Sequence, residues 1–320
     1  MDLRGVGLVQ DKPKIIVVGS SNMDLVVKAA RIPAVGETIL GEEFLMTPGG
    51  KGANQAVAAA KLGAEVCFVA KLGRDVFAQQ LLENLRKEGV NVEYVVATEE
   101  APSGVALITV DHVGDNVIVV APGANQRLSP PDVEKARSAI ASSGAVVAQL
   151  EVPLDAVESA ARLANDAHVP FILNPAPARK LSLELLAMVD VLTPNETEAS
   201  ILTGVEVINQ DTAETAAREL LRLGVKAVVL TMGAKGFLMA AGETTEFVAA
   251  VKVDAVDTTA AGDAFTGALA VGLARRETLR DAAFFANYAA ALSVTKMGAQ
   301  SSMPTRREVE HFISENPITR

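Results

Sequence analysis

The chain has 320 residues, of which 49% are hydrophobic and 21% charged, a composition typical of one large soluble domain. Its net charge of −10 and its 4% aromatic residues argue against a nucleic-acid-binding protein, which needs a basic surface or stacking side chains. The longest run without Lys, Arg, Asp or Glu, residues 282–295, is too short to cross a bilayer, and residues 1–14 show no signal-peptide pattern. With only one cysteine, Cys67, no internal disulfide can form, so we expect a cytoplasmic protein without membrane contact.

In chain order, apolar runs that suit buried strands alternate with stretches that suit helices. Such alternation predicts βαβ units, hence an α/β fold with a doubly wound, mostly parallel sheet and helices on both faces. The uninterrupted apolar character of the strands fits burial on both sides. The predicted strands are residues 15–18, 66–70, 145–150, 171–174, 189–192 and 227–231, and the predicted helices include 75–88, 133–141, 154–166 and 212–223.

Two segments interrupt this alternation. Residues 26–48 contain short extended runs and no helix, and residues 102–122 have a hairpin pattern around the turn at 112–115. Neither segment can form a core alone, so we expect both to build one small β-lid inserted in a single domain of residues 1–320.

The first strand leads into Gly19-Ser20-Ser21-Asn22-Met23-Asp24. This segment lacks the G-x-G-x-x-G pattern of a nicotinamide-dependent dehydrogenase. Asn22 and Asp24 follow the carboxyl end of a strand, where a doubly wound sheet binds its ligands. They either engage sugar hydroxyls or form a local Asx turn. Glu151, which follows the predicted strand ending at residue 150, is either a substrate contact or an ordinary loop acid.

A glycine loop, Gly49-Gly50-Lys51-Gly52-Ala53-Asn54-Gln55-Ala56, precedes an alanine-rich helix that ends at Gly63. It is not a Walker loop, because Lys51 is followed by glycine and position 45 is leucine. Lys51 is either a ligand-binding cation or a solvated turn lysine.

Two further segments follow predicted strands. Asn195-x-x-Glu198 fits a capping box at a helix start, which also forms a polar edge. Thr231-Met232-Gly233-Ala234-Lys235-Gly236 has glycines three residues apart, and Lys235 lies either near a phosphate or in water.

The most informative stretch is Thr258-Thr259-Ala260-Ala261-Gly262-Asp263, followed by an apolar helix over 264–274. A helix N-terminus binds anions through its free N–H groups, so a phosphate can dock here. Asp263, at the mouth of this site, is either the general base for a hydroxyl nucleophile or only the N-cap.

Segments 19–24, 49–56 and 258–267 resemble the sugar kinases of the phosphofructokinase-B superfamily. The glycine loop and Asn174-Pro-Ala-Pro-Ala are similar to the ribokinase branch of that family, and the resemblance covers about residues 14–304. It implies ATP-dependent phosphorylation of D-ribose at its primary hydroxyl, Mg²⁺ brought by ATP, K⁺ as an activator and a homodimer joined through the lid. Kinases for another sugar, deoxyribose or a nucleoside remain alternatives, as does a catalytically silent sugar-binding regulator.

The resemblance also assigns roles to residues. It makes Asp263 the catalytic base, with Ala260, Ala261 and Gly262 as the anion hole. The sugar-binding residues are Asn22, Met23, Asp24, Gly50, Lys51, Gly52, Ala53, Asn54, Glu151 and Asp263. The nucleotide-binding residues are Asn195, Thr231, Met232, Gly233, Ala234, Lys235, Gly236, Gly262, Asp263 and Asn287, the last at a position that is often histidine in the family. Asp257, Thr259, Ser293, Lys296, Gly298 and Ser302 match a K⁺ site, and Glu198 an indirect Mg²⁺ contact.

Overall fold

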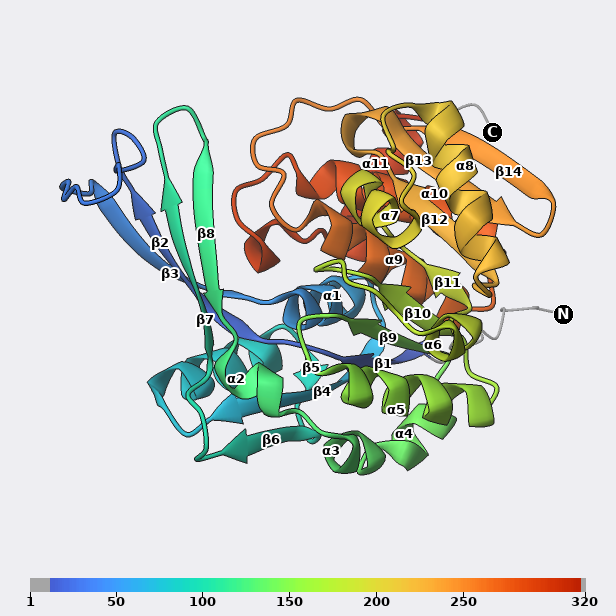
Figure 1. Cartoon of the computed structure of the whole chain (residues 1–320), viewed down its shortest axis with the longest axis horizontal. Helices are drawn as coiled ribbons and strands as arrows, with labels where there is room; N and C mark the ends of the chain where they lie inside the picture. The colour runs from blue at the N-terminus through green and yellow to red at the C-terminus, as the bar shows by residue number, and fades with distance from the viewer. Residues whose placement is uncertain (1–11, 318–320) are drawn as a thin grey trace, which may run out of the picture.

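A computed structural model describes residues 12–317 and shows two sheets of unequal size (Figure 1). The large sheet has the order β14-β13-β12-β11-β10-β9-β1-β4-β5, with β6 also paired to β4, and is parallel except at β12–β13–β14. The predicted α/β fold with a mostly parallel sheet is confirmed. The strands are β1 Lys14–Val18, β4 Glu65–Gly73, β5 Val90–Asn91, β6 Val95–Thr98, β9 Ala145–Gln149, β10 Phe171–Asn174, β11 Val191–Leu192, β12 Ala227–Thr231, β13 Gly236–Ala241 and β14 Thr244–Ala249.

Helices cover both faces of this sheet, and each face has its own buried apolar cluster. One face carries α1 Lys51–Lys61, α9 Ala261–Ala274, α10 Leu279–Ser293 and α11 Arg306–Glu315. The other carries α3 Pro130–Glu134, α4 Arg137–Ala141, α5 Leu154–Asp166, α6 Leu183–Ala187, α7 Glu196–Thr203 and α8 Gln210–Arg222. Helix α2 Val76–Lys87 packs near the smaller sheet, and three short 3₁₀ turns are η1 Gly123–Arg127, η2 Gly233–Lys235 and η3 Gln300–Ser302.

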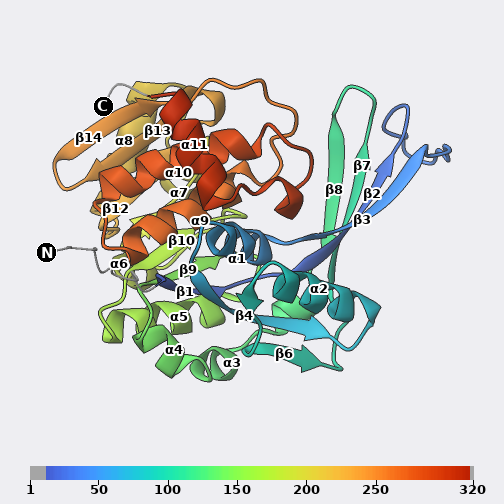
Figure 2. The ribbon, with the colours of Figure 1, turned by 180° about the vertical axis from the view of Figure 1, so that it is seen from behind.

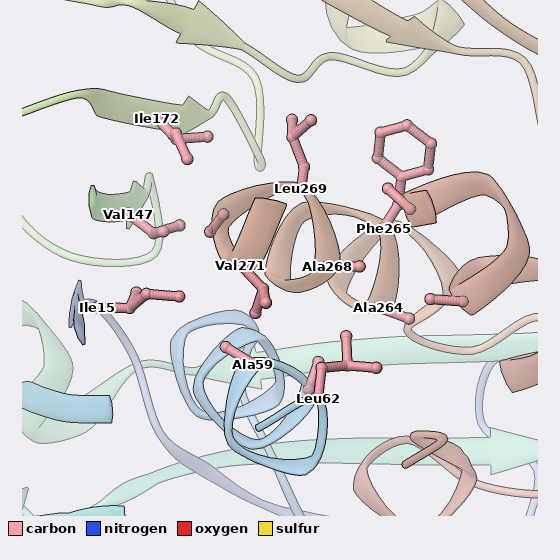
Figure 3. Packing of buried hydrophobic residues seen from close by; sticks show 14 of the residues in the cluster. Ile15, Ala59, Leu62, Val147, Ile172, Ala264, Phe265, Ala268, Leu269 and Val271 are labelled. Atoms are coloured by element: carbon pink, nitrogen blue, oxygen red, sulfur yellow. The ribbon is translucent and has the colours of Figure 1, made fainter. Parts of the chain in front are cut away.

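Helix α9 is the central helix of the first face (Figure 3). Its residues from Asp263 to Gly272 are all buried, and it lies between α1 and the strands β1 and β9. Gly267 allows the close approach to α1, because a Cβ atom there would lie 2.8 Å from the Cβ atom of Ala58 and from the carbonyl oxygen of Gln55. A larger residue would therefore force apart the two helices that begin at the glycine loop and at the anion-binding turn.

The smaller sheet stands away from the body of the protein (Figure 2). Its order is β3-β2-β7-β8, formed by β2 Asn22–Lys28, β3 Glu43–Gly49, β7 Gly104–Val110 and β8 Asn116–Ala121. We call this sheet the lid. It contains both segments in which a β-lid is expected, but its first strand begins at Asn22, four residues earlier than predicted. Asn22 and Asp24 are thus strand residues of the lid rather than members of an Asx turn.

Two predictions of local structure were wrong, and one hairpin was not predicted. Residues 133–141 form two short helices instead of one, because Lys135 and Ala136 end one helix and begin the next. The strand predicted over 189–192 is only Val191–Leu192, because each neighbouring strand pairs with just those two residues. The hairpin β13–β14, which turns at Gly242 with φ 55°, extends the sheet with antiparallel strands that were not predicted. Within residues 12–317, no helix has both the length and the apolarity that crossing a bilayer requires.

Candidate active site

The site lies at the carboxyl ends of β1 and β9, two neighbouring strands whose following loops run in opposite directions. Strand β1 is flanked by β4 on one side and β9 on the other, so loops after β1 and β9 diverge and leave a crevice at their carboxyl ends. The loop after β1 leads to Asn22 and Asp24, and Glu151 lies two residues beyond the end of β9. Helix α9 points its N-terminus at the same crevice.

Asp263 is the third residue of α9, and its side chain faces α1. It is only 5% exposed, and its two carboxylate oxygens accept hydrogen bonds from Asn54 Nδ2 and Gln55 Nε2, both at 2.9 Å. The N-cap is Ala260, which adopts φ 60° and makes no side-chain capping bond. The alternative that Asp263 is only an N-cap is therefore wrong.

The turn before α9 leaves room for an anion. A Cβ atom on Gly262 would meet nothing within 4 Å, and the first-turn N–H groups of a helix have no intrahelical acceptor. A cavity of about 180 Å³ lies here. Its lining includes Ala260, Ala261, Gly262, Asp263 and Lys51. An anion held there would contact backbone donors and lie beside the carboxylate.

Glycines let the lid and the glycine loop approach each other. A Cβ atom on Gly49 would lie 2.1 Å from Asp24 Oδ2, and Gly50, with φ 88°, is the N-cap of α1. Asn22 accepts a 2.7 Å hydrogen bond from Asn125 Nδ2. Polar side chains of the lid are thus fixed against the loop that carries Lys51.

Glu151 joins the loops after β1 and β9. Its Oε2 accepts a hydrogen bond from the Ser20 hydroxyl and a 3.0 Å bond from the Lys51 backbone N–H. It is therefore not an ordinary loop acid but part of the frame of the glycine loop. Among the other predicted sugar-binding residues, Met23 and Ala53 have buried side chains in the apolar core, so only their backbone atoms can reach a ligand.

Two neighbouring carboxylates act on the pKa of Asp24. Burial raises the pKa of Asp24 to about 7, and the negative charges of Glu151 and Asp263 add to the effect. The pKa of Lys51 is raised chiefly by Asp263, against the opposing effect of burial, with help from Glu151 and Glu198. Lys51 is therefore a cation surrounded by acids, not a solvated turn lysine.

Asn195 and Glu198 form the predicted capping box at the start of α7. Asn195 Oδ1 accepts from the Glu198 N–H at 2.8 Å, and Glu198 Oε2 accepts from the Asn195 N–H at 2.9 Å. Burial raises the pKa of Glu198, although the Asn195 N–H and Lys51 partly oppose this. Both residues line the 180 Å³ cavity, so the capped helix end is also a polar wall of the site.

A second cavity, of about 550 Å³, adjoins the first at Thr258 and Gly262. Its lining is largely apolar and comes from the segment before α9 and from α9 and α10 themselves. The lining also includes Thr231, Gly233, Ala234, Gly236 and Asn287. Such a chamber suits an adenine base. Lys235 is not among its lining residues: its ammonium pairs with Glu196 Oε1 at 3.0 Å. Met232 is buried in the core, so it can offer only backbone atoms.

The predicted cation-site residues come from two segments that meet beside α9. Asp257 accepts from the Thr259 N–H at 2.9 Å and the Gly298 N–H at 2.8 Å. Burial raises the pKa of Asp257, but these hydrogen bonds outweigh it and the net shift is downward. The Ser293 and Ser302 hydroxyls donate to the carbonyl oxygens of Ala290 and Ala299. Lys296 pairs its ammonium with Glu308 at 2.7 Å.

Comparison with known proteins agrees with this geometry. The family described as pfkB family carbohydrate kinase matches residues 12–306. The chain belongs to this family. It is 42% identical to a ribokinase of Haemophilus influenzae over 93% of this chain and 98% of that protein, and 43% identical to a ribokinase of Bacillus subtilis over 94% and 99%. A structure of Arabidopsis thaliana ribokinase complexed with ribose and ATP superposes with a TM-score of 0.87 at 35% identity, covering 94% of this chain and 99% of that one. A deoxyribokinase of Salmonella typhimurium is also similar, 40% identical over 94% of this chain and 99% of that protein.

Several polar residues of this carbohydrate kinase were not singled out from the sequence. Gln55 and Asn174 lie inside quoted motifs, and that position was a usable signal. Asn125 supports Asn22 and Ser21, and Gln300 donates to Asn54 Oδ1 at 3.1 Å. Asn125 and Gln300 carried no local signal, because only the fold brings them to the site. Within residues 12–317, no group of three or more His, Cys, Asp or Glu side chains is placed to hold a metal ion.

The raised pKa of Asp24 predicts a pH effect on stability. Between pH 3.8 and about 7 the folded, sugar-free protein binds a proton that the unfolded chain has released, so stability falls as the pH rises through this interval. Asp24→Asn lacks this titration. As the pH rises through the interval, the free energy of unfolding of Asp24→Asn should therefore increase relative to that of the wild-type protein, by up to a few kcal/mol. Urea unfolding at about pH 5 and about pH 8 measures the difference. Asp166→Asn, an exposed position on α5, controls for loss of a charge. Equal differences at both pH values would show that Asp24 is not destabilised when ionised.

Proposed function

We propose that this carbohydrate kinase transfers the γ-phosphoryl group of ATP to the primary hydroxyl of D-ribose, giving D-ribose 5-phosphate and ADP. One observation carries the proposal. The Asp263 carboxylate lies at the N-terminus of α9, between the polar residues of the lid and glycine loop and the 550 Å³ chamber suited to adenine. The names of the relatives, and the ribose and ATP in the Arabidopsis complex, support this choice of substrates.

We treat the chain as a single kinase domain with the lid inserted in it. The one cysteine, which leaves no internal disulfide, supports a cytoplasmic location.

The mechanism needs alignment and charge stabilisation more than covalent chemistry. Asp263 accepts the proton of the sugar hydroxyl as it attacks, and the backbone N–H groups of residues 260–262 hold the transferred phosphoryl. Lys51, whose ammonium lines the same cavity, balances the negative charge that develops there. Closure of the lid excludes water and limits hydrolysis of ATP.

Mg²⁺ fits the opposite wall of this cavity. Glu198 already accepts two hydrogen bonds from Asn195, so its free lone pairs suit a contact through water better than direct coordination. When bound with ATP, the ion neutralises charge on the phosphates.

The central prediction concerns the general base. Asp263→Asn keeps the size of the side chain but cannot accept the proton, so turnover should fall about 10²–10⁴-fold. Ribose binding, measured by calorimetry, should persist, and thermal unfolding should show an intact fold. Near-normal turnover of the purified variant, with wild-type contamination excluded, would contradict the assignment.

A substrate panel tests the choice of sugar. Asn22, Asp24 and Glu151 offer polar groups at the lid side of the crevice, and such groups are left unpaired when a hydroxyl is missing. Ribose should exceed 2-deoxyribose, fructose and adenosine in kcat/KM, measured by coupled release of ADP. A higher value for 2-deoxyribose would assign the activity named for the Salmonella relative. No ADP release with any sugar would favour the silent regulator.

We propose K⁺ as an activator on the geometry beside α9. The hydroxyls of Ser293 and Ser302 donate to carbonyls and keep their lone pairs free for a cation, together with Asp257. The Lys296 ammonium pairs with Glu308, so Lys296 can offer its backbone carbonyl to the ion without repelling it. Asp257 is six residues before Asp263, so an ion here would order the anion-binding turn.

Activity should therefore rise when K⁺ replaces tetramethylammonium at constant ionic strength, and Asp257→Asn should weaken the response. A flat titration with the wild-type protein would remove K⁺ from the proposal.

We also propose a homodimer joined through the lid. The lid exposes apolar side chains that include Phe44 (58%), Met46 (48%), Leu107 (52%) and Val119 (60%), and its outer strands have open edges. A small sheet with this surface favours pairing with a second copy, and a two-fold arrangement is the commonest closed one.

Light scattering at micromolar concentration should give a mass near twice 33.3 kDa. Val119→Lys, which places a charge across the register from Leu107, should shift the mass toward the monomer. Asn165→Lys, at an exposed position on α5, adds the same single positive charge and serves as the control. A wild-type monomer with full activity would contradict the dimer.

A further inference from the structure

Five amide side chains form a continuous hydrogen-bonded chain through Asp263. On one side Gln149 Nε2 donates to Gln55 Oε1 at 2.6 Å, and Gln55 Nε2 donates to Asp263 Oδ1 at 2.9 Å. On the other side Asn54 Nδ2 donates to Asp263 Oδ2 at 2.9 Å and Gln300 Nε2 donates to Asn54 Oδ1 at 3.1 Å. The chain ends at α2, where Asn84 Nδ2 donates to Gln300 Oε1 at 2.7 Å. We call these residues the amide chain.

The direction of every bond in the amide chain follows from chemistry. An ionised carboxylate only accepts hydrogen bonds, so Asn54 and Gln55 must turn their NH₂ groups toward Asp263. Their oxygens then point away and need donors. Gln149 and Gln300 supply these donors, and neither of them lines the 180 Å³ or the 550 Å³ cavity.

Burial prevents water from replacing these partners. Gln55 and Gln149 are fully buried, and Asn54 and Gln300 are each 6% exposed. A reversed amide would place an oxygen against the carboxylate and leave buried donors without acceptors, which is costly in this environment.

We propose that Gln300 and Gln149 are positioning residues that hold the amides of Asn54 and Gln55, and through them the carboxylate of Asp263, in the orientation that proton transfer requires. This inference rests on the proposed role of Asp263 as the general base. Gln300 is the sharper probe, because Asn84 fixes its orientation from the far side, whereas Gln149 Oε1 has no hydrogen-bond partner within residues 12–317.

Two substitutions at Gln300 separate orientation from packing. Gln300→Glu keeps the bond from Asn84 but presents only acceptors, so Asn54 must reverse and turn its oxygen toward Asp263. Gln300→Met has similar length and no hydrogen bond, and it leaves the Asn54 NH₂ group on the carboxylate. We expect kcat to fall about tenfold or more in Gln300→Glu, because a mispaired buried group is costly. In Gln300→Met, which mispairs no group at Asp263, kcat should fall about threefold or less. The KM for ATP should stay within about twofold in both variants, since the reversed amide lies on the side of Asp263 away from the 550 Å³ chamber.

Two control pairs separate reversal of the amides from the effect of an added charge. Gln80→Glu compared with Gln80→Met makes the same substitutions at an exposed position on α2 and should leave kcat unchanged. Gln149→Glu compared with Gln149→Met makes the corresponding test on the other side of Asp263. Gln55 Nε2 there also donates to Asn174 Oδ1 at 3.2 Å, so the same order is expected with a smaller difference. Thermal unfolding of all variants separates lower stability from lower kcat.

A spectroscopic readout makes the inference independent of turnover. The side-chain NH₂ signal of Asn54, assigned by its loss in Asn54→Asp, should shift in Gln300→Glu and stay near its wild-type position in Gln300→Met. Two results would overturn this inference but leave the proposed function intact. One is an equal kcat for Gln300→Glu and Gln300→Met while the wild-type protein phosphorylates ribose. The other is an unshifted Asn54 signal in Gln300→Glu. A wild-type protein that phosphorylates no sugar would instead overturn the proposed function, and the Asn54 signal would still decide whether the amides reverse.

Discussion

The site depends on the contact between α1 and α9. Each helix begins at a glycine-containing turn with a special backbone conformation, Gly50 at φ 88° and Ala260 at φ 60°. Gly267 lets the two helices approach until Asn54 and Gln55 reach both oxygens of Asp263. The Asp263 carboxylate therefore belongs to one helix, but its orientation is set by another.

The lid depends on the same region. Its first strand begins at Asn22, where it pairs with Gly49 of β3 and Gly104 of β7. A Cβ atom on Gly104 would lie 2.2 Å from Asn22 Oδ1, so the small residue is required by close packing against a polar side chain. The base of the lid is thus packed tightly against Asn22, one of the residues predicted to bind the sugar.

Electrostatics account for the way an acidic protein can bind a polyphosphate. The charges of Asp263, Glu151 and Glu198 raise the pKa of Lys51, and those of Glu151 and Asp263 add to the raised pKa of Asp24. A site with so many carboxylates cannot attract phosphate by net charge. Backbone N–H groups at the start of α9 and a local cation can do so instead, because both act at short range in a buried setting.

The sequence by itself determined the fold class, the lid segments and most of the motifs, because strand burial, helix capping and glycine turns are local properties with local signals. It also predicted the capping box of Asn195 and Glu198, which needs only residues three positions apart. It left two roles open for Asp263, since N-cap and first-turn positions differ by a few residues and propensity does not separate them. Only the tertiary structure excluded the N-cap, by placing the carboxylate against Asn54 and Gln55. Only the tertiary structure, too, brought Asn125, Gln149 and Gln300 to the site. These residues carry no local signal because their partners lie about a hundred or more positions away in the chain, and packing of the helices on the sheet alone brings them together.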